Sequence, residues 1–186
     1  MSYLRTFLPW IVFALVPARD WHWGALAAFL IAAGLIAQQR QAGRSADALI
    51  MEIGSAAFFA ALAVLAFVDP GSALRPYSAA ISSAVLSLIA AVSLLIRRPF
   101  TLGIAKQSAP REVWGLRGFI RANVVITSVW TAAFAVTAIA LALIDHAGHS
   151  HSLGATLVQV GGLVVPILFT VRYVAHVQSA ARAAGA

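Results

Sequence analysis

Long apolar runs alternate with short polar segments along the chain. A helix crosses about 30 Å of hydrocarbon with roughly 17–25 mostly apolar residues. Five runs meet that length: Trp21–Gln38, Leu49–Val68, Tyr77–Ile96, Ala122–Ile144 and Ser152–Val171. The pattern predicts an all-α polytopic membrane protein, in which residues 1–186 form a single integral membrane domain.

A sixth apolar run, Phe7–Pro17, has only 11 residues. It could cross the bilayer if its helix extended back through Tyr3 and the Arg5 side chain reached the interface. Otherwise it is an interfacial or re-entrant segment. We expect the first arrangement, which gives a bundle of six transmembrane helices with a short first helix.

The composition excludes a soluble globular domain and a disordered chain. Hydrophobic residues make up 61% of the chain, charged residues make up 10%, and the mean hydropathy is +0.89. Soluble domains average roughly 45–50% apolar and about 25% charged residues, and disordered chains are poorer in apolar residues.

The absence of cysteine excludes disulfides and thiolate metal sites. No hydrolase or nucleotide-binding motif is present, so we expect no cofactor, and an enzyme is the least supported class.

The basic residues are divided unequally between the two sides of the predicted bundle. Arg19 and Arg75 fall on one side, and all the other basic residues of the 13 fall on the opposite side. Cytoplasmic segments of membrane proteins carry such a surplus, so we predict that both termini are cytoplasmic. Because this topology accounts for the net charge of +7, we expect no nucleic-acid partner. The expected partner is the lipid bilayer with its anionic lipids.

Glu52 is the only carboxylate inside an apolar run. An ionisable side chain within a bilayer is a candidate functional group, and it needs a partner. Three arginines, Arg97, Arg98 and Arg121, are predicted at a similar depth. We expect one of them to pair with Glu52, because an ion pair offsets the cost of desolvating either charge. The carboxylate would then either fix the topology or couple transport to a proton or another ion.

Asn123, Thr127 and either Trp130 or Thr131 share one face of a predicted helix, because three or four residues separate them. Together with Arg121, this face could line a vestibule that opens to the cytoplasm. Its polar groups could equally form hydrogen bonds between helices. Small residues at four-residue spacing in the preceding run predict close helix packing; they are Ala79, Ser83, Ser87 and Ala91.

The longest polar segment is Arg97–Leu116, in which apolar residues are interleaved with basic ones. This pattern is typical of a segment that lies on the inner leaflet, where each basic residue gains on the order of 1 kcal/mol from anionic lipids. Lys106, Arg111 and Trp114 are therefore candidates for contact with the lipid surface.

Three histidines, His146, His149 and His151, lie in the predicted connection on the opposite side. Imidazole is a common ligand of zinc, copper and nickel. The short spacing provides no closed set of ligands, however, so adventitious binding is the favoured interpretation and a metal site is the weaker one.

Three stretches carry a resemblance to a known group of proteins: SLLIRRPFTL at 93–102, EVW at 112–114 and NVVITSVW at 123–130. They resemble small bacterial inner-membrane proteins of the intracellular septation protein A type. The resemblance covers residues 47–135 and implies a bacterial inner membrane, but it says little about activity. It groups into one constellation Glu52, Arg97, Arg98, Pro99, Phe100, Thr101, Asn123, Thr127 and Trp130.

Three classes of function remain open. The favoured class is a small transporter or channel-like protein with a polar cluster open to the cytoplasm. The second is a non-catalytic cell-envelope scaffold or an anionic-lipid-binding protein. The third is a substrate-capture subunit, similar to the six-helix vitamin-binding components of energy-coupling transporters. Because six short helices enclose little volume, a homo-oligomer or a membrane-protein partner is plausible.

Overall fold

The computed structural model describes residues 5–43, 49–149 and 152–183. Within these ranges the chain is helical and contains no strand, which confirms the all-α prediction for them. The helices are α2 (Leu8–Leu15), α3 (Trp21–Gln41), α4 (Ile50–Val68), α5 (Ser78–Leu95), α6 (Phe100–Ala105), α7 (Arg117–His146) and α8 (Leu153–Ala183), with 3-10 turns at Ala18–Asp20 and Arg111–Val113.

Five of the described helices are long and apolar enough to cross a membrane, namely α3, α4, α5, α7 and α8. This confirms the coarse prediction of a multi-pass membrane protein. The predicted count of six spans is not confirmed. The run Phe7–Pro17 forms α2, whose eight residues are too few to cross a bilayer.

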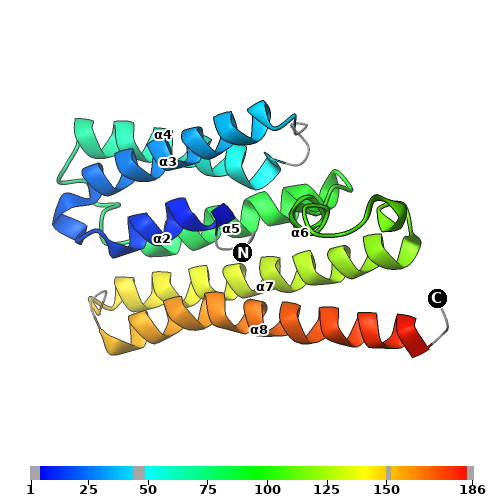
Figure 1. Cartoon of the computed structure of the whole chain (residues 1–186). Coiled ribbons are helices and arrows are strands. Elements are labelled where there is room, and N and C mark those ends of the chain that lie inside the picture. Colours follow the sequence, from blue (N-terminus) through cyan, green and yellow to red (C-terminus); the bar gives the residue numbers. More distant parts are fainter. Residues whose placement is uncertain (1–4, 44–48, 150–151, 184–186) are drawn as a thin grey trace.

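The connections between the helices gather at two ends of the bundle (Figure 1). One end holds the α3–α4 connection, the α5–α7 connection with α6, and the end of α8; we call it the basic end. The opposite end holds the α2–α3, α4–α5 and α7–α8 connections, with Arg19 and Arg75. The described basic residues of the elements that meet at the basic end are Arg40 in the last turn of α3, Arg97 and Arg98 after α5, Lys106 and Arg111 between α6 and α7, and Arg117 and Arg121 at the start of α7. Arg5 bonds Gln38 near the end of α3, and Arg172 lies in the second half of α8.

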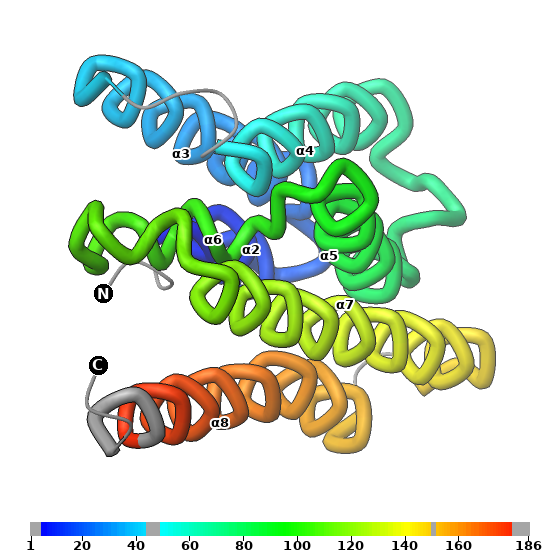
Figure 2. The backbone as a smooth tube through the Cα atoms, turned by 90° about the vertical axis from the view of Figure 1, so that its right-hand side faces the viewer, coloured from blue at the N-terminus to red at the C-terminus, as the bar shows by residue number. Residues whose placement is uncertain are grey.

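The long helices form two main pairs, with α8 added to one of them. The first pair is α3 with α4, and the second is α5 with α7, where α8 packs on the outer side of α7 (Figure 2). The Ser87 hydroxyl donates a hydrogen bond to the Thr131 carbonyl oxygen at 3.0 Å, which confirms that the small-residue face of α5 packs on α7. α7 and α8 approach so closely at Gly162 that a Cβ on this residue would overlap the Thr137 hydroxyl.

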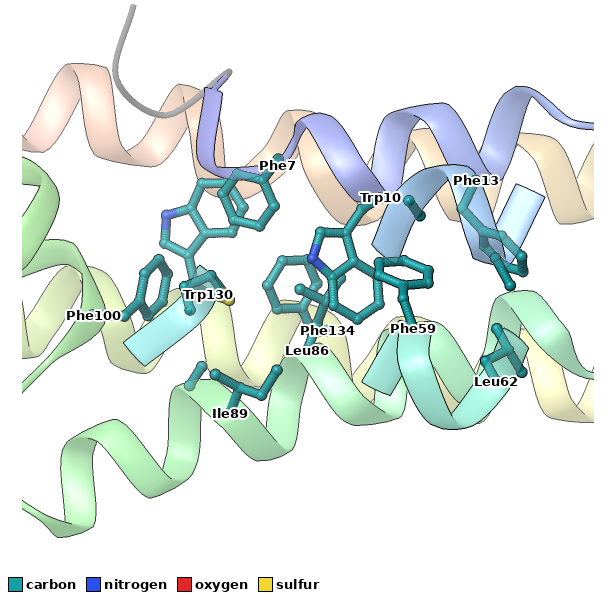
Figure 3. Packing of buried hydrophobic residues seen from close by; sticks show 14 of the residues in the cluster. Phe7, Trp10, Phe13, Phe59, Leu62, Leu86, Ile89, Phe100, Trp130 and Phe134 are labelled. Carbon is teal, nitrogen blue, oxygen red and sulfur yellow. The ribbon is translucent and has the colours of Figure 1, made fainter. Parts of the chain in front are cut away.

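We call residues 5–15, which include α2, the N-terminal segment. Its aromatic side chains join the two helix pairs (Figure 3). Phe7, Trp10 and Phe13 are buried on one face of this segment. Phe7 stacks on Trp130 of α7 with ring centroids 4.9 Å apart, and Trp10 stacks on Phe58 of α4 at 5.2 Å. Such pairs contribute about 0.5–1.5 kcal/mol each beyond the burial of their area. The run that was expected to be a short span, or an interfacial or re-entrant segment, is therefore part of the core.

A tight turn after α5 brings α6 back to the bundle. The Arg98 N–H donates to the Ser93 carbonyl oxygen at 2.8 Å, and the Arg97 N–H donates to the Leu94 carbonyl oxygen at 2.9 Å. These bonds form a Schellman motif, in which Arg97 adopts the left-handed conformation with φ 58°. Pro99 follows, and α6 then buries Phe100, Thr101 and Ile104.

Candidate functional site

The Glu52 carboxyl group is buried in the first turn of α4, near the basic end. Its residue is only 4% exposed. The Thr6 hydroxyl donates a hydrogen bond to Glu52 Oε1 at 3.0 Å, and the Gln39 amide nitrogen donates to the same oxygen at 3.2 Å. The side chain is thus held by neutral groups from the N-terminal segment and from α3. We call Thr6, Gln39 and Glu52 the Glu52 cluster.

The arginines that were predicted to pair with Glu52 lie elsewhere. The side chains of Arg97, Arg98 and Arg121 are exposed. Within the described part of the chain, no basic side chain forms an ion pair with Glu52. The expected ion pair is therefore wrong, because the turn after α5 leaves its two arginines on the surface while the N-terminal segment covers Glu52. Neutral donors take the place of the arginines.

The fit between α2 and α4 positions Thr6 over Glu52. One turn farther along, the Trp10 indole N–H donates to the Ser55 hydroxyl at 2.8 Å, and that hydroxyl donates to the Met51 carbonyl oxygen at 2.7 Å. Both segments run from the basic end toward the opposite end (Figure 1), so residues one turn apart on each meet in register. Arg5 forms a hydrogen bond with Gln38, next to Gln39 on α3.

A second polar cluster joins α6 to α7; it consists of Thr101, Asn123 and Thr127. The Thr101 hydroxyl lies 3.0 Å from the Asn123 carbonyl oxygen, to which it donates, and 2.8 Å from the Thr127 hydroxyl. The Asn123 amide nitrogen donates to the Phe119 carbonyl oxygen at 2.9 Å. All three residues of this Thr101 cluster are at most 3% exposed. The predicted hydrogen bonding between neighbouring elements is found for the Thr127 side chain, whereas the Asn123 side chain bonds only its own helix.

Trp130 has a structural neighbour that the sequence did not indicate. Its indole N–H donates to the Thr170 hydroxyl of α8 at 3.0 Å, and this hydroxyl donates to the Pro166 carbonyl oxygen at 2.7 Å. Trp130 therefore links α7 to α8 as well as to Phe7. Sequence reasoning also missed Thr6 and Gln39. Both lie near the ends of apolar runs. A polar residue there is normally taken as the boundary of a helix and not as a hydrogen-bonding partner of a buried group.

The connection between α6 and α7 brings together the three residues predicted for the lipid surface. The Lys106 ammonium nitrogen lies 5.3 Å from the centre of the Trp114 ring, and the Arg111 guanidinium carbon lies 5.7 Å from it. These are cation–π distances. The Trp114 indole N–H donates to the Ala109 carbonyl oxygen at 3.0 Å, which holds the ring against its own connection.

The histidines expected as weak metal ligands are at the end opposite to Glu52. His146 and His149 are exposed, and His151 lies outside the described residues. In the ranges that the structure does describe, no three His, Cys, Asp or Glu side chains gather closely enough to hold a metal ion.

Comparisons with protein-family models, with curated proteins and with solved structures find no match for this chain. The resemblance to proteins of the septation protein A type stays a prediction.

The chemistry open to the Glu52 cluster follows from its partners. The hydroxyl of Thr6 can donate a hydrogen bond to a carboxylate or accept one from a protonated carboxyl, and the Gln39 side chain carries both kinds of group. Either charge state of Glu52 can therefore be accommodated. A metal cation would need several oxygen ligands, whereas the described neighbours of Glu52 direct donors at it.

Proposed function

We propose that the protein is a small transporter of a bacterial inner membrane that moves protons through reversible protonation of Glu52. Both termini and the basic end face the cytoplasm. The observation that carries this proposal is a carboxyl group that is 4% exposed and held only by neutral hydrogen-bonding groups among the described residues. Intramembrane carboxyl groups of this kind serve proton relays in pumps and transporters.

The neutral surroundings of Glu52 favour a proton-exchanging role over a purely structural one. A topology-fixing carboxylate would be expected to hold an arginine, because a buried charge without a countercharge is costly. Glu52 has no such partner in the described part of the chain. Proton binding would remove this charge without requiring a countercharge.

The packed interior favours a carrier over an open channel. Rings of Phe7, Trp10, Trp130 and Phe134 fill the space between the α3–α4 pair and the α5–α7 pair (Figure 3). A continuous water-filled pore is not compatible with such stacked rings on that route. Transport would therefore require a rearrangement in which the N-terminal segment moves away from Glu52.

The test uses liposomes that contain the purified protein and a trapped pH-sensitive dye. A potassium gradient with valinomycin sets an interior-negative potential, and acidification of the interior reports proton entry. We expect entry above that of protein-free liposomes for the natural sequence. Glu52→Gln, which keeps the shape and hydrogen bonding of the side chain but cannot ionise, is expected to reduce entry to the protein-free level.

The matched control is Asp145→Asn. Asp145 is also buried, at 8% exposure, but it lies at the opposite end in the last turn of α7. This variant should retain proton entry. Entry that persists in Glu52→Gln would remove Glu52 from the mechanism, and the absence of entry with the natural sequence would contradict the proposed transport.

A second candidate function is contact with anionic lipid through the α6–α7 connection, and the cation–π arrangement favours it. Lys106 and Arg111 converge on Trp114, which combines positive charge with an amphipathic ring. In nanodiscs, brominated anionic lipids should quench Trp114 fluorescence more than brominated zwitterionic lipids do. Comparison with Trp114→Phe gives the part of the fluorescence that comes from Trp114. The double variant Lys106→Gln, Arg111→Gln should abolish the stronger quenching by the anionic lipid. Equal quenching by both lipids would contradict this candidate.

A further inference from the structure

A shallow groove runs along the surface at α8, away from both polar clusters. Its volume is about 480 Å³, and the residues that line it are Val165, Leu168, Phe169, Arg172, Tyr173 and His176. All six are on α8 at positions i, i+3, i+4, i+7, i+8 and i+11, so they form one face of that helix. Phe169 stacks on Tyr173 with ring centroids 5.3 Å apart, which makes an aromatic wall.

The polarity of the groove changes along its length. Val165, Leu168 and Phe169 are apolar, whereas Arg172, Tyr173 and His176 carry polar groups and lie nearer the basic end. Arg172 is 19 residues after Leu153, the first residue of α8. At 1.5 Å per residue this is about 29 Å, close to the roughly 30 Å thickness of the hydrocarbon layer. The polar part of the groove therefore lies at the membrane interface, and its apolar part lies within the hydrocarbon layer.

α8 lies at the edge of the bundle: only 17% of its span is buried, against 39% for the span of α7. On the groove face, Val165, Leu168, Arg172 and His176 are exposed, whereas Phe169 and Tyr173 are half-buried and pack against the core. Arg172 is exposed and makes no hydrogen bond or ion pair with a described residue. Because a guanidinium stays charged and binds phosphate oxygens in a bidentate manner, the head of the groove is complementary to an anionic phosphate group.

We propose that this groove binds one anionic phospholipid. Its phosphate lies on Arg172, with Tyr173 and His176 beside it, and one acyl chain follows Phe169, Leu168 and Val165 toward the middle of the bilayer. The site is separate from the α6–α7 connection, and it does not depend on whether Glu52 moves protons.

A second groove on the same molecule provides an internal control. It has a volume of about 550 Å³ and lies between α3 and α4, and its lining residues are all apolar: Leu26, Phe29, Ala60, Ala63, Val64, Phe67 and Val68. This groove can bind acyl chains but offers no group for an anionic head. It should therefore bind anionic and zwitterionic lipids equally.

The experiment uses the full-length protein in nanodiscs that contain phosphatidylglycerol or phosphatidylcholine with a photoreactive acyl chain. Mass spectrometry of peptides then measures labelling of α8 and of the α3–α4 groove separately. We expect labelling around Val165–Tyr173 to favour phosphatidylglycerol, while the α3–α4 groove shows no preference. Loss of one interfacial charge in Arg172→Gln should lower phosphatidylglycerol labelling at α8 about fivefold.

Two further variants keep the result decisive. Arg117→Gln removes an exposed charge at the basic end but outside the groove, so α8 labelling should not change. Leu168→Trp fills the apolar part of the α8 groove and should lower the labelling of α8, whereas the labelling of the α3–α4 groove should not change. Equal labelling of α8 by both lipids would overturn the proposal. An equal loss in Arg117→Gln and Arg172→Gln would also overturn it, because it would show a general surface potential instead of a site.

Discussion

The Glu52 cluster and the Thr101 cluster are built from similar parts but differ in charge. Each is buried toward the basic end, and in each a threonine hydroxyl joins a short segment to a long helix. Thr101 and Thr127 bond each other within a neutral group. Glu52 instead brings an ionisable group into an equally closed space. We propose that similar burial serves cohesion at the Thr101 cluster and proton exchange at the Glu52 cluster.

The largest expected difference between the clusters is in proton entry. In the liposome assay Glu52→Gln should lower proton entry at least tenfold, because only this change removes the carboxyl group that we propose exchanges protons. Thr101→Val, which removes the central hydroxyl of the other cluster, should leave the rate within about twofold of the natural sequence. Equal losses in the two variants would show that both clusters act only through the fold.

The next largest effect is on stability at the Glu52 cluster. Thr6→Val removes one of the two donors to a buried carboxyl group, and leaving a buried polar group without its hydrogen bond costs about 1–3 kcal/mol. The free energy of unfolding, measured by SDS titration in lipid–detergent micelles, should fall by that amount. Thr6→Ser is the control, because it keeps the hydroxyl. If Thr6→Val cost no more than Thr6→Ser, the hydroxyl would not be supporting Glu52.

A smaller loss is expected at the neutral cluster. Thr127→Val removes the hydroxyl that meets Thr101 at 2.8 Å, and interhelical hydrogen bonds in membranes contribute about 0.6–1.7 kcal/mol. The same SDS titration should show a destabilisation in that range. Ser128→Ala is the matched control on the next residue of α7: its hydroxyl is exposed and bonds only its own helix. A loss at Ser128→Ala as large as at Thr127→Val would contradict the assigned link between α6 and α7.

The smallest effect has the opposite sign. Arg97 occupies the left-handed position of the turn that carries Thr101 into its cluster, and this conformation costs a non-glycine residue about 1 kcal/mol. Arg97→Gly should therefore raise the melting temperature slightly and leave proton entry unchanged. A lower melting temperature would mean that the arginine side chain stabilises the turn by more than its backbone costs.

The long helices were predictable because their signal is local. The run Tyr77–Ile96 became α5 at Ser78–Leu95, and Leu49–Val68 became α4 at Ile50–Val68. Apolar length alone determines such elements. The first segment was not predictable in the same way. Its position in the fold depends on the contact of Phe7 with Trp130 and on that of Trp10 with Phe58. Both partners are distant from it in the sequence.

The site was predicted only in part, for a related reason. Glu52 was recognisable as an isolated carboxylate in an apolar run, and the shared helix face of Asn123 and Thr127, both of which are buried, followed from helical spacing. The partners of Glu52 were not recognisable, because charge complementarity favours arginine, whereas the packing of the N-terminal segment supplies Thr6 instead. A left-handed arginine at position 97 also has no sequence signal, since this place is normally taken by glycine.

The measurement that tests the central claim most directly is the accessibility of single cysteines to a membrane-impermeant thiol reagent. The chain has no cysteine of its own, so one can be placed at Ser108, near the basic end, and another at Ala147, at the opposite end. Both positions are exposed. We predict that Ala147→Cys is labelled in intact cells and that Ser108→Cys is labelled only after the membrane is permeabilised. Labelling of Ser108→Cys in intact cells would contradict the proposed orientation, and with it the placement of Glu52 on the cytoplasmic side.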